Sequence, residues 1–101
     1  METPALRLVR RERRAVLRYD VSIPIEFYGH TGRTRNVSEY GVCFETDQWL
    51  PTGDTTSFVL VFRDFAGLPS WRIAGSGKVV RVEECGGRFV IALRVTTYAL
   101  V

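Results

Sequence analysis

Residues 36–46 read Asn-Val-Ser-Glu-Tyr-Gly-Val-Cys-Phe-Glu-Thr (NVSEYGVCFET), and this stretch predicts a β-hairpin. In a strand that ends at Ser38, the side chains of Asn36 and Ser38 project to one face and that of Val37 to the other. The residues after Ser38 predict a turn, in which Gly41 is free to adopt a positive φ. The hairpin then presents a small polar pair beside a bare glycine, a surface that a flat ligand can approach closely. The alternative interpretation is a hairpin turn with ordinary polar residues.

Short β-rich segments continue on both sides of this hairpin, separated by turn residues at the spacing typical of a barrel or sandwich. The predicted strands are Val21–Tyr28, Thr34–Ser38, Val42–Thr46, Thr56–Phe62, Trp71–Val82 and Arg88–Val95. Pro24 places the first strand at an edge or after a kink. Gly75 and Gly77 permit the bend or bulge that closing a small barrel requires. Residues 96–101 are apolar or β-branched, so they either extend the last strand or cap an open barrel end.

Length and composition are those of one folded domain, with 101 residues, 46% of them hydrophobic and 25% charged. No apolar run approaches the roughly 18 residues that span a bilayer, and the N-terminus lacks the apolar core of a secretory signal. We therefore expect a cytoplasmic protein that does not insert into membranes. Cys43 and Cys85 lie alone, outside any CxxC pattern, so we expect two reduced thiols rather than a disulfide or a zinc site.

Positive charge is concentrated near the N-terminus. Residues 1–36 hold eight arginines against four acidic side chains, whereas residues 37–101 are slightly acidic. Arginine recognises phosphate and guanine by planar, bidentate hydrogen bonds, whereas lysine acts as a point charge. Residues 1–19 carry only a ragged apolar pattern, so we expect a flexible basic arm at 1–19 followed by a barrel at 20–101. The alternative for the charge is a solvated basic tail.

Motifs of catalysis and metal binding are absent from the sequence. The single histidine, His30, lies between Gly29 and Thr31 in a predicted turn, with no cysteine or carboxylate at ligand spacing. HExxH, GxSxG and GxxxxGK[ST] do not occur, and the carboxylates are scattered. We therefore expect no enzyme, no catalytic residue, no metal and no cofactor.

Two short motifs occur in a fixed order: Arg14-x-x-x-Arg18 before the first strand, and Asn36-x-Ser38-x-x-Gly41 in the next hairpin. Each is weak alone, since the arm holds other arginine pairs at the same spacing. Together they resemble the PilZ domain family, whose fingerprint is RxxxR followed by [DN]xSxxG. The segments 18–27, 50–53 and 77–82 are also similar to the family, so that the resemblance runs from about residue 10 to residue 93.

The resemblance implies a six-stranded antiparallel β-barrel that binds the bacterial second messenger cyclic di-GMP. It implies that Arg14 and Arg18 grip the ligand, with Arg13 as a further contact. Asn36, Ser38 and Gly41 would form the platform on the barrel. Many members of the family end in a helix, for which residues 95–101 show no clear pattern.

The expected function is that of a cyclic di-GMP receptor or adaptor module whose N-terminal arm folds onto the barrel when the ligand binds. An effector protein would then read the bound state, and nucleic acid is not an expected partner. Two alternatives stay open. One is a nucleic-acid-binding β-barrel, for which Tyr19, Phe27, Tyr28, Tyr40 and Trp49 could supply aromatic contacts. The other is a PilZ-like interaction module that has lost its ligand.

Overall fold

The computed structural model describes residues 8–11, 16–63, 67 and 69–100, and almost all of these residues lie in strands or turns. The strands are β1 (Leu8–Arg11), β2 (Val16–Tyr19), β3 (Pro24–Phe27), β4 (His30–Ser38), β5 (Gly41–Thr46), β6 (Thr55–Phe62), β7 (Trp71–Cys85) and β8 (Arg88–Leu100). Within the described ranges, no helix is long and apolar enough to cross a membrane.

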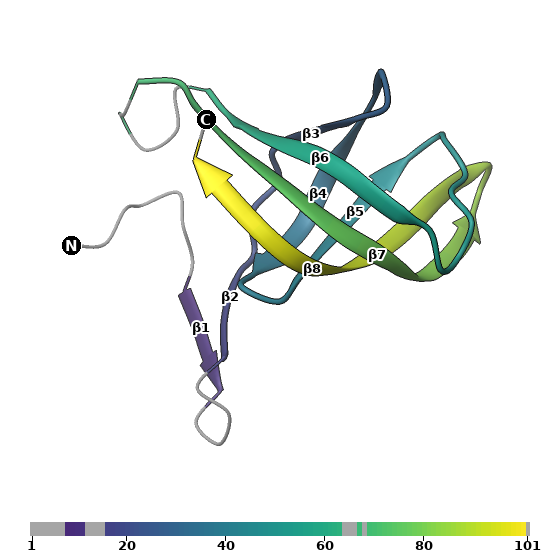
Figure 1. Ribbon diagram of the computed structural model, residues 1–101, viewed down its shortest axis with the longest axis horizontal. Coiled ribbons are helices and arrows are strands. Elements are labelled where there is room, and N and C mark those ends of the chain that lie inside the picture. The colour runs from purple at the N-terminus through teal and green to yellow at the C-terminus, as the bar shows by residue number, and fades with distance from the viewer. Residues whose placement is uncertain (1–7, 12–15, 64–66, 68, 101) are drawn as a thin grey trace.

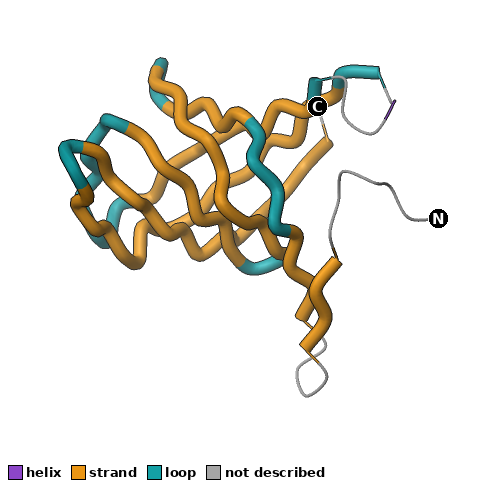
Figure 2. The backbone as a smooth tube through the Cα atoms, turned by 180° about the vertical axis from the view of Figure 1, so that it is seen from behind, coloured by secondary structure: helices purple, strands orange, loops and turns teal. Residues whose placement is uncertain are grey.

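Strands β3–β8 form a closed antiparallel barrel of six strands (Figure 1). The sheet runs in the order β4-β3-β6-β7-β8-β5, and a further pairing of β4 with β5 closes the ring. Figure 2 shows the same closed wall of strands from the opposite side. Closure leaves none of the six strands with an unpaired edge inside the barrel wall. The fold class predicted from the sequence, a six-stranded antiparallel β-barrel, is confirmed.

Strands β1 and β2 pair with each other and project from the barrel (Figure 1). This pair joins the wall through two residue pairs between β2 and β4, Arg18 with Ser38 and Tyr19 with Val37. The described parts of the predicted arm are therefore two short strands, which the sequence pattern had not indicated. The flexibility of residues 1–19 and the boundary after residue 19 stay predictions.

The core fills the inside of the barrel, mostly with every second side chain along a strand, although consecutive residues are buried at Leu60–Phe62 and at Val90–Ile91. In β5 the burial alternates strictly, with Val42, Phe44 and Thr46 buried and the residues between them partly exposed. This period of two follows from the pleat of a strand. The fully buried apolar side chains are Ile25, Val42, Phe44, Phe58, Leu60, Val79 and Ile91.

The first hairpin of the barrel turns earlier than the sequence predicted. Tyr28 and Gly29 both have positive φ, 48° and 78°, as the two central residues of the tight turn that suits the twist of paired strands. His30 is therefore the first residue of β4 rather than part of a turn, although it is solvent-exposed as expected. Strand β3 begins at Pro24, which lacks an N–H, so the prediction that the first strand starts at Val21 was wrong.

Bulges and close backbone contacts shape the two longest strands, β7 and β8. The ladder between them shifts register between Ser76 and Gly77, which confirms the bulge predicted around Gly75 and Gly77. A Cβ atom at Gly75 would lie 2.4 Å from the Phe58 ring, so any other residue here would have to displace this ring or the strand. β8 continues to Leu100, so the C-terminal residues extend the last strand.

Candidate functional site

A β-bulge at Arg35 turns the polar residues of β4 outward. Thr34 pairs with Phe44 and Asn36 with Cys43, so Arg35 is the extra residue of β4. Without the bulge, Asn36 would share the inward face of Thr34, because faces alternate along a strand. With the bulge, Val37 packs against the core, and Asn36 and Ser38 lie on the outer side. The prediction that Asn36 and Ser38 share one face is confirmed.

Ser38 closes the turn between β4 and β5. Its Oγ accepts hydrogen bonds from the backbone N–H groups of Tyr40 at 3.2 Å and Gly41 at 3.1 Å. The hydroxyl thus fixes the local backbone and has a structural part besides any contact with a ligand. By contrast, the Asn36 amide has no hydrogen-bond partner among the residues that the structure describes, so its donors and acceptor are free for a ligand.

Arg18 lies directly opposite Ser38 in the ladder between β2 and β4. Directly opposed residues of an antiparallel pair point to the same side of the sheet, so the two sequence motifs meet at this pair. The exposed Arg18 side chain lies 3.5 Å from the Asp20 carboxylate, a solvent-exposed ion pair that contributes roughly 0–1 kcal/mol. Arg13 and Arg14, the other predicted ligand contacts, lie outside the described residues.

Gly41 lies beside Ser38, at the start of β5. The predicted positive φ of Gly41 was wrong, since its φ is outside the left-handed region. The structure gives a different reason for glycine here: a Cβ atom would lie 3.1 Å from the carbonyl oxygen of Leu93 on the neighbouring strand. Asn36, Ser38 and Gly41 together form what we call the hairpin face.

Tyr98 of β8 holds the hairpin face in place from the inside. Its hydroxyl donates a hydrogen bond to the backbone carbonyl of Ser38 at 2.8 Å. Burial raises the pKa of Tyr98 to about 12, so the phenol keeps the proton that it donates. Next to this contact a mainly apolar cavity of about 400 Å³ is lined by Tyr19, Val37, Ser38, Trp71, Tyr98 and neighbouring residues.

Charged side chains of both signs lie near the outer face of β5. Burial raises the pKa of the Cys43 thiol, and the charges of Arg81 and Arg35 oppose this effect. Arg35 is bound to Glu45 at 2.7 Å, a contact that raises the pKa of the guanidinium. Cys43 and Cys85 are both free thiols, as predicted.

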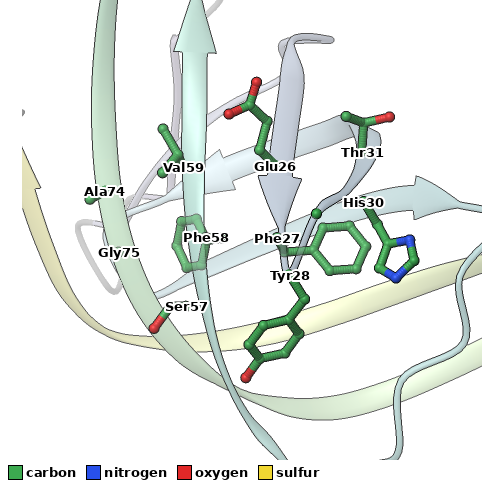
Figure 3. Close-up of a pocket in the computed structure, with 11 residues that line it drawn as sticks. Glu26, Phe27, Tyr28, His30, Thr31, Ser57, Phe58, Val59, Ala74 and Gly75 are labelled. Carbon is green, nitrogen blue, oxygen red and sulfur yellow. The ribbon is translucent and has the colours of Figure 1, made fainter.

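A second, larger cavity of about 610 Å³ lies at the other end of the β3–β4 hairpin (Figure 3). Its lining includes Glu26 and His30, which would be the natural acid–base pair. Figure 3 shows the Glu26 carboxylate and the His30 ring pointing away from each other, and Glu26 is bound to Arg72 at 2.8 Å. Among the described residues, no group of three His, Cys, Asp or Glu side chains could hold a metal ion. The hairpin face is therefore the better candidate for a functional site.

Sequence reasoning missed three features of this region. The residue types around Arg35 do not indicate that β4 bulges there. Tyr98 lies 60 positions from Ser38, so its hydrogen bond could not be foreseen. Arg94 lies opposite Gly41 in the ladder between β5 and β8, a pairing that likewise joins distant segments.

Comparisons with known proteins agree with the barrel fold. The family model described as "PilZ domain" matches residues 8–99. Among solved structures, the chain is similar to the Bacillus subtilis inhibitor of motility, MotI/DgrA, with a TM-score of 0.71 and 13% sequence identity over 90% of this chain. The match covers 45% of that chain, so this chain spans less than half of its length. No curated protein matches this sequence. PilZ domains are binding and adaptor modules, and the match over nearly the whole chain shows that this protein belongs to the PilZ domain family.

Proposed function

We propose that this PilZ domain binds cyclic di-GMP on the hairpin face and acts as a receptor or adaptor in bacterial second-messenger signalling in the cytoplasm. The observation that carries the proposal is the pairing of Arg18 with Ser38, because it joins the arginine motif to the hairpin motif on one surface. Arg13, Arg14 and Arg18 would hold the ligand from the N-terminal side, and Asn36, Ser38 and Gly41 would form its platform.

The chemistry of these side chains suits a guanine dinucleotide. Arginine donates two parallel hydrogen bonds to guanine O6 and N7, a pair that discriminates by about 1–3 kcal/mol against other bases. It also forms bidentate bonds with phosphate. Asn36 offers a free amide to a base edge, and Gly41 presents no side chain that would obstruct a flat ring. The exposed ion pair of Arg18 with Asp20 is weak enough for a phosphate to replace it.

Signal transmission would use the N-terminal arm. Residues about 5–18 carry closely spaced arginines that repel one another, and a bound dianion reduces this repulsion. The arm would then pack onto the barrel and present a changed surface to an effector protein. The small contact between β2 and β4, two residue pairs, supports a hinge at this point. The ligand can shift the arm only by its differential affinity for the two states.

The alternative of a nucleic-acid-binding barrel gains no support from the placement of the aromatic residues. Phe27 is buried, at 2% exposure, and Tyr19 packs against the core. Tyr28 and Tyr40 are exposed but lie at opposite ends of the nine-residue strand β4, which separates them by about 30 Å. Tyr28 and Tyr40 therefore do not belong to one continuous stacking surface of the kind that single strands bind.

Calorimetric titration with cyclic di-GMP tests the proposal, with GTP and single-stranded RNA as controls. We expect a dissociation constant in the micromolar range, about −7 to −9 kcal/mol. Arg18→Ala should weaken binding by about 1.5–3 kcal/mol, the contribution of charged hydrogen bonds. Arg18→Lys should restore little, because lysine lacks the planar fork. No heat at about 100 µM ligand, far above a micromolar constant, would refute the proposal.

Hydrogen exchange tests the transmission step separately. Protection should rise across residues 10–19 and 36–41 when cyclic di-GMP is added, and should change little in residues 71–93. An arm that is fully protected without ligand would rule out the ordering step while leaving the binding proposal intact. Full binding by Arg18→Lys would favour bulk charge, and with it the nucleic-acid alternative.

A further inference from the structure

Two positive side chains face each other on the outer wall of the barrel. Lys78 of β7 pairs directly with Arg94 of β8, and both side chains are exposed. Like charges placed directly opposite one another destabilise an antiparallel pair. Neither side chain forms an ion pair with any described residue, whereas Arg18, Arg35, Arg72 and Arg81 each have a carboxylate partner. The repulsion between Lys78 and Arg94 is thus uncompensated within the described chain.

The ladders place this pair in line with the hairpin face. Arg94 is the partner of Gly41 in the ladder between β5 and β8. Gly41 lies beside Ser38, because the N–H of Gly41 donates a hydrogen bond to the Ser38 hydroxyl. Ser38 is in turn the ladder partner of Arg18. One row therefore crosses five neighbouring strands in the order Arg18, Ser38, Gly41, Arg94 and Lys78, which we call the cationic row.

The row has positive ends and a small, flat centre. Neighbouring strands lie about 4.8 Å apart, so Arg18 and Arg94 are separated by three spacings, or about 14 Å between backbones. Paired residues share a face, so both guanidinium groups extend from the same outer surface as the bare Gly41. A nucleotide that lies across Ser38 and Gly41 would have one arginine on each side.

Two carboxylates on the neighbouring strands β5 and β7 are engaged with other cations. Glu45 is bound to Arg35, and Glu83 lies 3.5 Å from Arg81. The exposed Glu39 in the β4–β5 turn has no ion pair with a described residue. An anion at the row is therefore attracted by Arg94 and Lys78 without first breaking an ion pair with them.

We infer that Arg94 and Lys78 are ligand-binding residues that hold the phosphodiester of a guanine dinucleotide from the side opposite Arg18. Arg94 supplies the bidentate contact to phosphate or to guanine O6 and N7, and Lys78 acts as a point charge. This inference rests on the proposed function, since it takes the ligand to lie on the hairpin face. It adds two residues that neither sequence motif contains.

The test compares Arg94→Ala and Lys78→Ala with Arg88→Ala as a matched control. Arg88 is on the same strand and carries the same charge, but lies six residues from Arg94, or about 20 Å along the strand. In titrations with cyclic di-GMP, we expect about a tenfold weaker affinity for Arg94→Ala and a smaller loss for Lys78→Ala. Arg88→Ala should stay within about twofold of the wild type.

Thermal unfolding of the free proteins separates binding from structure. Because removal of Arg94 relieves a like-charge pair, Arg94→Ala should unfold at the same temperature as the wild type or above it. A lower melting temperature together with weaker binding would indicate a structural role and overturn the inference. Equal losses in Arg94→Ala and Arg88→Ala would overturn it as well, because net charge would then explain both.

The proposed function and this inference fail in different ways. If the wild type binds, Arg18→Ala loses affinity and Arg94→Ala binds like the wild type, the proposed function stands and the inference is wrong. If the wild type does not bind cyclic di-GMP at all, both are wrong.

Discussion

Thr34→Val should destabilise the barrel by about 2–3 kcal/mol, although valine has nearly the same shape as threonine. Thr34 is 2% exposed, and its hydroxyl accepts a hydrogen bond from the Ile23 N–H at 3.0 Å and donates one to the carbonyl of Val21. Valine would leave both of these buried backbone groups unpaired. Each unpaired group costs about 1–3 kcal/mol, reduced in part by relaxation or by a water molecule.

Thr56→Val is the matched control for this change. Thr56 is 0% exposed, and its hydroxyl has no hydrogen-bond partner among the described residues. Valine there removes a buried polar group without breaking a bond. We therefore expect no loss of stability, or a gain of up to about 1 kcal/mol.

Denaturation by urea or heat measures both variants on the same scale. For a domain of this size, 1 kcal/mol corresponds to about 4–8 °C in melting temperature, so Thr34→Val should melt about 8–24 °C below the wild type. Equal losses in Thr34→Val and Thr56→Val would refute the reasoning, because the hydrogen bonds of Thr34 would then contribute nothing beyond packing. A loss below about 0.5 kcal/mol in Thr34→Val would refute it as well.

Three further outcomes follow from the described contacts. Burial raises the pKa of Tyr98 from 10.0 to about 12, so the folded protein holds the phenol proton more tightly than the unfolded chain does. The free energy of unfolding should therefore fall as the pH rises from 10 to 12. The melting temperature of Tyr98→Phe should fall less than that of the wild type over the same range. Gly75→Ala should destabilise the barrel by about 1–3 kcal/mol, because the added methyl group overlaps with Phe58. In urea denaturation, adding Phe58→Leu to this variant should recover part of the loss. A Gly75→Ala variant as stable as the wild type would contradict the close packing. Gly41→Val should keep a β-type far-UV spectrum and reduce affinity for cyclic di-GMP at least tenfold, and unchanged affinity would place the site elsewhere.

Local patterns in the sequence indicated a barrel or sandwich, and the resemblance to the PilZ family implied the six-stranded barrel. Alternation specified that Asn36 and Ser38 share one face and Val37 takes the other, because successive residues of a strand point to opposite sides. Gly75 and Gly77 marked the place where β7 bulges. The two short motifs identified the PilZ family, which the family model confirms over residues 8–99. The roles of the individual motif residues stay predictions.

The composition of the candidate site depended on contacts that the sequence pattern does not contain. The bulge at Arg35 depends on how β4 meets β5, and it decides that Asn36 points outward. A side chain at Gly41 would crowd a neighbouring carbonyl, and Gly41 does not adopt a positive φ, whereas Tyr28 adopts the positive φ in the first turn. Arg94 joins the cationic row because β8 pairs with β5 in one register. Alternation and turn preference are local properties of the chain, but register is set by the packing of strands that are distant in sequence, and a shift of one residue would turn Arg94 to the other face of its strand.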